Sequence, residues 1–390
     1  MTLMDYDMMF WNRGQDIFWQ FSQGIVAPKR DIMRALRGVK KRIIAIGIFH
    51  VVLLSGCSTA AYVIRLGFGQ TKVFLCSRSN EAIFRDPSIS QETKDRINFV
   101  LEVKQYAEER LGLKKTGNYS RYYKVNSQGL LYLISACPKD SLNPYQWNFP
   151  IVGRMSYKGF FSLREAEREK EKLEEAGFDT CLRGVRAYST LGWFKDPIFS
   201  SMLNQNKVII AQIVIHELTH TTVFIEDHLD FNEQMATFVG DQGAIDFFSE
   251  RYGKYSPDYL DACNMRDDDL IFGKFIEGIC SDLKLLYSRG LSRKKKLELR
   301  EVIFREAKER FRDLLVKLKT PLYLSFEDEG LNNAVLLSYW QYVGRLGVFK
   351  GLYNSLGEDL GEMVAFLKDV KRSGEDPMEF VQRRLHGQNP

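Results

Sequence analysis

The sequence predicts an α+β fold in which a small sheet accompanies a buried helix carrying the motif HELTH, followed by a mainly helical C-terminal lobe. The buried helix is predicted by residues 208–215, an almost wholly apolar run that leads directly into HELTH at residues 216–220. The sheet is predicted by two strand-like stretches, residues 151–161 and 178–187, which flank a charged helix. The lobe is predicted by the helical pattern from Pro257 onward. A chain of 390 residues with 45% hydrophobic content can bury one large core or two closely packed ones.

The N-terminal part has the pattern of a bacterial lipoprotein signal. Residues 34–42 carry five basic side chains and no acid, and an apolar run follows at residues 43–54. About a dozen apolar residues suit a signal peptide and are short for a membrane span. Ser55-Gly56-Cys57 then completes the pattern at which a cysteine is lipidated and the chain is cut, so Cys57 would become the N-terminus. The alternative is a short buried helix that ends at a cysteine.

The position of this signal divides the chain into four predicted segments. Because the basic region starts directly after Met33, residues 1–32 are predicted to be an extension upstream of the true start. Residues 33–56 are the predicted lipoprotein signal, residues 57–256 the α+β region, and residues 257–390 the helical lobe. The alternative for residues 1–32, with their tryptophans and phenylalanines, is an extra amphipathic segment.

The predicted location is the bacterial cell envelope, with the protein anchored to the membrane through its N-terminal lipid and facing the periplasm. Ser58, in place of an aspartate after the cysteine, favours the outer membrane. Removing residues 1–56 takes away eight Lys/Arg and four Asp/Glu, so the net charge falls from +5 to +1. This balance gives no support for a nucleic-acid partner, which needs a basic patch or stripe.

Downstream of Cys57, the pattern predicts alternating helices and strands. Residues 96–113 space apolar side chains at helical intervals and end beside a glycine, which predicts an amphipathic helix. Residues 121–125 and 130–136 are predicted to form a hairpin. A capping box at residues 162–165 starts the charged helix that runs to Gly177. Together with the flanking strands, this unit is predicted to form the sheet against which the HELTH helix packs.

The HELTH motif predicts a catalytic zinc site. On a helix, residues four apart share a face, so His216 and His220 can converge on one ion while Glu217 projects towards the metal-bound water. In a strand, two histidines four apart would be too distant to share a metal. The whole chain has only five histidines, which makes their clustering here informative.

The third ligand is predicted to be Glu233. If the first helix ends near Phe224, a second helix opening near Asn232 can bring Glu233 back to the two histidines. Two histidines, a glutamate and a water form the open tetrahedral site of thermolysin-type peptidases. Glu226 and His228, in the turn between the helices, remain alternative ligands.

The C-terminal lobe and the cysteines add few functional features. The lobe is predicted to close one wall of the cleft, and residues 294–296, three lysines, are predicted to be a solvated helix start. None of the cysteines forms a close CxxC pair, so a thiol metal site is not expected. One disulfide, between Cys263 and Cys280, is a candidate in an oxidising compartment.

With these motifs in view, the chain resembles the putative aminopeptidase family of bacterial lipoproteins, zinc-peptidase-like proteins of the gluzincin type with an HExxH and NExxA signature. The resemblance covers nearly the whole chain from Gly56. It rests on HELTH and FNEQMAT, and on three further blocks: YKGFF at 157–161, AYSTLGWFKDP at 187–197 and LNNA at 331–334. It implies a zincin-like core, zinc as the metal and a peptide as the substrate. It also implies His216, His220 and Glu233 as ligands and Glu217 as the base.

The mechanism expected from these residues is hydrolysis by a zinc-activated water, with Glu217 passing the proton of the water to the leaving amine. Tyr157 or Tyr188 could donate a hydrogen bond from its hydroxyl to the developing oxyanion, although a tyrosine in such a position is more often a packing residue. Asn332 and Asn333 could orient the substrate or cap a helix.

Two other functions are compatible with the sequence. One is a non-catalytic envelope lipoprotein with a structural zinc or no metal, although a structural site would not require Glu217. The other is a metal-dependent hydrolase of a non-peptide amide in cell-wall material.

Overall fold

The computed structural model describes residues 57–125, 130–149, 153–185 and 195–387. The predicted extension and signal, residues 1–56, lie outside these ranges. In the described part, helices dominate, the sheets are small, and the C-terminal region is helical, which confirms the α+β class. The predicted zincin-like core and the domain boundary at residue 256 stay predictions.

The central sheet has three strands in the order β6-β3-β7, with β3 (Leu131–Pro138) antiparallel to both neighbours. The outer strands are β6 (Tyr157–Phe160) and β7 (Phe178–Val185), and α6 (Leu163–Glu175) connects them. The predicted strand, helix, strand unit is therefore present. Its first strand is shorter than predicted, and Ser162 precedes α6 without a side-chain capping bond.

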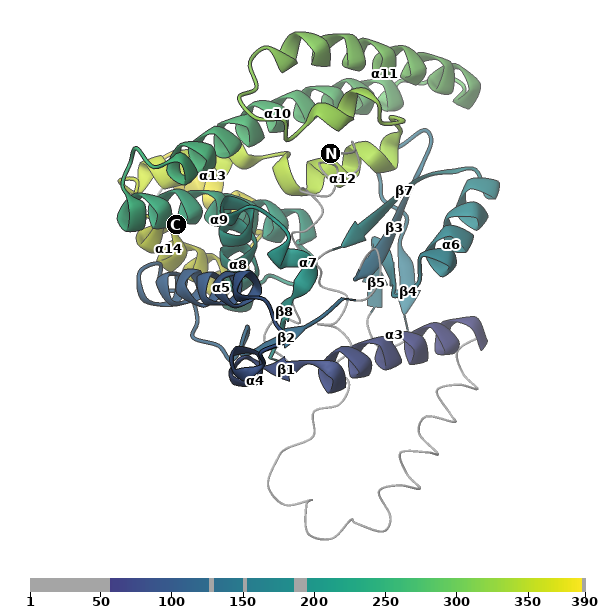
Figure 1. Cartoon of the computed structure of the whole chain (residues 1–390). Coiled ribbons are helices and arrows are strands. Elements are labelled where there is room, and N and C mark those ends of the chain that lie inside the picture. Colours follow the sequence, from purple (N-terminus) through teal and green to yellow (C-terminus); the bar gives the residue numbers. More distant parts are fainter. Residues whose placement is uncertain (1–56, 126–129, 150–152, 186–194, 388–390) are drawn as a thin grey trace.

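Two smaller sheets lie beside the central one (Figure 1). One has the order β1-β2-β8, and the other pairs β4 with β5. Their strands are β1 (Arg78–Ser79), β2 (Arg121–Tyr123), β8 (Ile198–Phe199), β4 (Trp147–Phe149) and β5 (Gly153–Met155). The predicted hairpin is wrong, because β2 pairs with β1 and β8 whereas β3 belongs to the central sheet.

Helix α5 (Gln91–Glu109) begins and ends earlier than the predicted range 96–113. It begins earlier because the hydroxyl of Ser90 accepts a hydrogen bond from the backbone N–H of Thr93 at 3.2 Å and caps the helix. It ends before Gly112, whose φ of 68° lies in the left-handed region. The apolar residues that extended the predicted helical pattern are still buried, but in the loop after the helix.

The HELTH motif lies on α8 (Lys207–Thr222), which is buried from Val208 to Thr221. Helices α5, α9 (Leu229–Tyr252) and α10 (Pro257–Ser288) pack around it. The prediction that α8 packs against the central sheet is wrong, because α6 and α12 pack against that sheet instead. A helix that is apolar on every side needs neighbours all round, and three helices supply them here.

The C-terminal lobe is helical, as predicted. Pro257 starts α10 after the cap Ser256, whose hydroxyl accepts from the backbone N–H of Tyr259. Its other elements are α11 (Arg293–Leu315), the 3₁₀ helix η4 (Leu324–Glu327), α12 (Asn333–Val343), α13 (Leu346–Ser355), α14 (Leu360–Ser373) and α15 (Pro377–Leu385). Among the described residues, no helix has the length and apolarity to cross a membrane.

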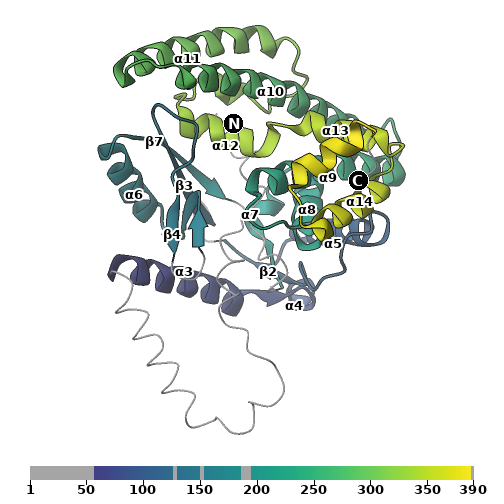
Figure 2. The ribbon, with the colours of Figure 1, turned by 180° about the vertical axis from the view of Figure 1, so that it is seen from behind.

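Helix α3 (Cys57–Cys76) lies along the opposite side of the molecule from α10 and α11, as the two views in Figures 1 and 2 agree. It packs on the edge of the central sheet, where Tyr62 meets Phe160 with ring centroids 5.5 Å apart. The short helix α4 (Asn80–Arg85) follows β1 in the chain. The remaining short helix, α7 (Ser200–Leu203), follows β8.

Five cysteines of the described part are free thiols: Cys76, Cys137, Cys181, Cys263 and Cys280. The predicted disulfide between Cys263 and Cys280 is wrong. Both residues lie on α10, and 17 residues of helix separate their backbones by about 25 Å. A disulfide requires Cα atoms within about 7 Å.

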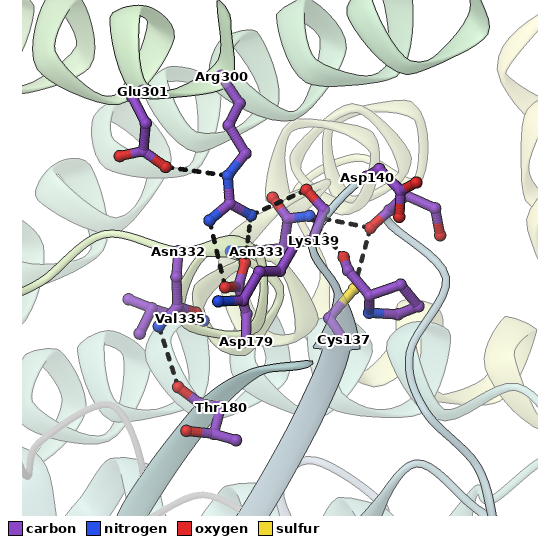
Figure 3. Close-up of polar contacts among 12 residues, drawn as sticks. Cys137, Lys139, Asp140, Asp179, Thr180, Arg300, Glu301, Asn332, Asn333 and Val335 are labelled. Carbon is purple, nitrogen blue, oxygen red and sulfur yellow. Dashed lines mark hydrogen bonds and ion pairs between the residues drawn. The ribbon is translucent and has the colours of Figure 1, made fainter. Parts of the chain in front are cut away.

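A buried polar network joins the central sheet to the C-terminal lobe (Figure 3). Arg300 of α11 donates to the carboxylate of Asp179 at 2.7 Å and to the carbonyl oxygen of Lys139 at 2.8 Å. The backbone N–H of Asn333 donates to the same carboxylate at 3.0 Å, and its side-chain amide donates to the carbonyl oxygen of Pro138 at 2.8 Å. One carboxylate on β7 therefore holds both α11 and the start of α12.

We expect Arg300→Met to destabilise the fold by about 3–5 kcal/mol, because it leaves the buried carboxylate of Asp179 without its cation. The two side chains are only 8% and 5% exposed. The matched control is Arg310→Met on the same helix, where the pair Arg310–Asp282 is about half exposed and should contribute at most about 1 kcal/mol. Urea unfolding measures both variants, and equal losses would show that the network carries little stability.

Candidate metal centre

The two histidines of HELTH converge at the C-terminal end of α8. Asn206 starts this helix by accepting a hydrogen bond from the backbone N–H of Ile209 at 2.9 Å. His216 and His220 lie one turn apart, and their Nε2 atoms are 3.0 Å from each other. Both side chains are buried. The helical geometry that the sequence predicted for this pair is therefore present.

Glu233 reaches the histidines because Asn232 fixes the turn between α8 and α9. The side chain of Asn232 accepts from the backbone N–H of Ile225 at 2.9 Å and donates to the carbonyl oxygen of Ile225 at 2.7 Å. These two hydrogen bonds tie the first turn of α9 to the loop. The Oε2 of the next residue, Glu233, then lies 3.3 Å from Nε2 of His216 and 3.6 Å from Nε2 of His220.

A close approach of the two helices supports this geometry. A Cβ added to Gly240 of α9 would lie 2.9 Å from the carbonyl oxygen of Gln212 and 3.3 Å from the Cβ of His216. Only glycine leaves the two backbones free to pack this closely beside the histidine. Glu233 is therefore positioned both by the loop before α9 and by the packing of α9 on α8.

The three side chains could hold a metal ion. Their ligand atoms all lie within 4.8 Å of one another, and all three residues are buried. Two imidazole nitrogens and one carboxylate oxygen form a donor set that suits zinc and leaves a fourth position open. The alternative ligands are not in this group: Glu226 is exposed, and Nδ1 of the half-buried His228 lies 3.9 Å from a carboxylate oxygen of Asp376.

Glu217, the predicted base, is buried beside the two histidines on α8. Tyr119 lies close enough for the charge of Glu217 to act on its phenol, and sequence reasoning missed this residue. Burial raises the pKa of Tyr119 well above its usual value, and the charges of Glu217 and Asp196 add to the effect. The hydroxyl therefore stays protonated and can donate a hydrogen bond.

The backbone of Tyr119 is held in an uncommon conformation. Its φ is 62°, its N–H donates to the carbonyl oxygen of Asp196 at 2.7 Å, and its carbonyl oxygen accepts from the side chain of Asn80 at 2.8 Å. A tyrosine with positive φ is rare and marks a position that its surroundings fix. No motif in the sequence indicates it, because the loop that carries it is about 100 residues before HELTH.

The other residues that the sequence suggested for the site lie in different parts of the molecule. Tyr157 starts β6 and is buried in the wall of a cavity, whereas Tyr188 lies outside the described residues. Asn332 caps α12 by accepting from the backbone N–H of Val335 at 2.9 Å. Asn333 belongs to the Asp179 network. Both asparagines therefore serve the structure, which confirms the capping alternative for Asn332.

The cavity, which we call the Trp340 pocket, has a volume of about 260 Å³ and is lined among others by Tyr157, Asp230, Lys284, Trp340 and Arg345. One of its lining residues, Asp230, precedes the candidate ligand Glu233 by three residues of α9, about 4.5 Å along the helix axis. The amide of Gln234 also donates to the carbonyl oxygen of Trp340 at 2.8 Å. Helices α10 and α12 form part of its wall. That the C-terminal lobe closes one wall of the active-site cleft stays a prediction.

A larger groove of about 990 Å³ lies between α5 and the N-terminal end of α8. Residues Asn206, Lys207 and Ile210 of α8 line it. It is therefore at the end of α8 away from the histidines, and none of the three candidate ligands lines it. The Trp340 pocket is not lined by the three candidate ligands either, but its lining residue Asp230 lies three residues before Glu233 on α9.

Comparison with known proteins gives one match. The sequence pattern of the family described as "Putative aminopeptidase" matches residues 61–385, which is most of the chain. No curated protein and no solved structure matches. The match agrees with the resemblance carried by the sequence motifs. The chain belongs to the putative aminopeptidase family.

Proposed function

We propose that this protein is a zinc-dependent peptidase that acts as an aminopeptidase. The observation that carries the proposal is the buried group of His216, His220 and Glu233, with Glu217 beside it on the same helix. A structural metal site needs no such glutamate, whereas a hydrolytic site needs a base next to the metal. The family name supports the choice of peptide bonds and of the N-terminal end.

When bound, zinc would supply a Lewis acid that polarises the scissile carbonyl and acidifies water. His216, His220 and Glu233 would hold it. Glu217 accepts the proton of the attacking water and delivers it to the leaving amine. The protonated hydroxyl of Tyr119 is suited to donate to the oxyanion that develops on the carbonyl, and Tyr157 and Tyr188 remain predicted donors for the same role.

The test measures bound zinc and peptide hydrolysis on the same preparation. We expect close to one zinc per chain and release of single amino acids from peptides with a free N-terminus. A chelator should abolish the activity and added zinc should restore it. A protein that holds one zinc and hydrolyses neither free nor N-acetylated peptides would refute the peptidase function. Cleavage of N-acetylated peptides alone would refute the aminopeptidase assignment.

We also propose that the protein is anchored to the cell envelope through a lipid on Cys57, with its catalytic part facing the periplasm. Cys57 is the first residue of α3, and the outward side of this helix supports a membrane location. Phe68 and Leu75 are each 72% exposed, and Ile64 is 41% exposed. The two charged residues of α3 are both basic, Arg65 and Lys72, which suits an anionic lipid surface.

Replacing the lipidated cysteine gives a direct test. Cys57→Ala should leave an uncleaved, unlipidated precursor, because the cysteine thiol is the site at which lipid is attached. Mass spectrometry of the purified protein from membranes reports both the N-terminus and the lipid. A wild-type protein with an intact Met1 would refute the anchor. Cys76→Ala, a change at the exposed cysteine of the same helix, should be processed normally.

A further inference from the structure

Three charged side chains surround the indole of Trp340 in the Trp340 pocket. The indole N–H donates to the carboxylate of Asp230 at 3.1 Å. The Nζ of Lys284 lies 5.1 Å from the ring centroid, and the Cζ of Arg345 lies 5.4 Å from it. Both cations therefore make cation–π contacts with one tryptophan.

The pocket has an excess of positive charge. Asp230 is the one acid among its lining residues, against Lys284 and Arg345. Within the described parts of the chain, neither cation has a carboxylate at ion-pair distance. An anionic group that entered the pocket would meet two cations and a single carboxylate, that of Asp230.

We propose that the Trp340 pocket binds the N-terminal residue of the substrate and selects an acidic one, glutamate or aspartate. This inference rests on the proposed aminopeptidase function. Asp230 binds the free ammonium group one helical turn from Glu233, and Lys284 with Arg345 binds the side-chain carboxylate. The two charged groups of an acidic N-terminal residue are only a few bonds apart, so both can be met around one indole.

Size and charge both favour this occupant. A cavity of about 260 Å³ is smaller than the roughly 300–1,000 Å³ of sites for drug-sized ligands, and it suits a single residue. A leucine side chain would displace water from two cations and return no hydrogen bond. A lysine side chain would be repelled by like charge. Glutamine has the size of glutamate but lacks the charge, and is therefore the matched comparison.

The first experiment measures binding without turnover. L-Glutamate and L-glutamine are titrated into the zinc-loaded full chain by calorimetry. Hydrogen bonds to charged groups contribute about 1.5–3 kcal/mol, so glutamate should bind at least about tenfold more tightly. Lys284→Met and Arg345→Met should each reduce this ratio towards one. Lys350→Met is the control, because Lys350 makes a cation–π contact with Tyr353 on α13, outside the pocket, and should keep the ratio.

The second experiment compares hydrolysis of 4-nitroanilides of glutamate, glutamine, leucine and lysine. We expect kcat/KM for the glutamate anilide to exceed that for the glutamine anilide by at least about tenfold. Asp230→Asn should lower kcat/KM for the glutamate anilide by a larger factor than it lowers the zinc content. Equal binding of glutamate and glutamine would overturn the proposed selectivity, whatever the hydrolysis assay shows. Hydrolysis of leucine or lysine anilides in preference to glutamate would overturn it while leaving the aminopeptidase function in place.

Discussion

Glu217→Gln is expected to lower peptide hydrolysis by about 100- to 10,000-fold, which corresponds to roughly 3–5 kcal/mol of activation free energy. The amide nearly preserves the shape of the carboxylate but cannot accept the proton of the attacking water. Glu217 is buried on a helix that is packed on all sides, so an isosteric change should leave the fold intact. Steady-state rates with one peptide, normalised to bound zinc, measure the effect.

The control for this prediction is the zinc content of the Glu217→Gln variant. Because Glu217 is not one of the three grouped ligands, the variant should retain close to one zinc per chain and unfold at the same urea concentration as the wild type. A loss of zinc would mean that Glu217 acts as a ligand. If the variant bound zinc and hydrolysed peptides at the wild-type rate, the base would lie elsewhere and the mechanism would have to be abandoned.

Much of the candidate centre could be predicted from the sequence, because its geometry is local. Helical periodicity alone brings His216 and His220 together, and a turn of a few residues returns Glu233 to them. Asn232 could not be assigned in the same way. Its double hydrogen bond to Ile225 depends on where α9 begins, and that start lies three residues earlier than the sequence predicted.

Long-range pairing accounts for what the sequence did not reveal. The strand β2 was paired with the wrong neighbour because its partners β1 and β8 lie about 40 and 75 residues away along the chain. A role for Tyr119 could not be predicted for the same reason, since only the tertiary structure brings it near Glu217. The disulfide error was different: helical rise on α10 excludes it once the helix is known to be continuous.

Replacing any of the three candidate ligands should weaken zinc binding strongly. His216→Ala and His220→Ala should each release zinc, and Glu233→Gln should weaken binding by removing the ligand charge. The loss should exceed the roughly 10- to 100-fold that follows from losing only a supporting hydrogen bond to a ligand. Competition with a chelator of known affinity measures it, and circular dichroism checks that each variant is folded.

The matched control is Glu226→Gln, the same substitution seven residues earlier in the exposed turn. It removes one negative charge near the centre without touching the grouped ligand atoms, so zinc affinity should stay within a few-fold of the wild type. This comparison separates a ligand from a nearby charge. If Glu233→Gln kept full affinity while Glu226→Gln lost it, the third ligand would lie in the turn. The buried carboxylate 3.3 Å from His216 would then be a structural partner of the histidines.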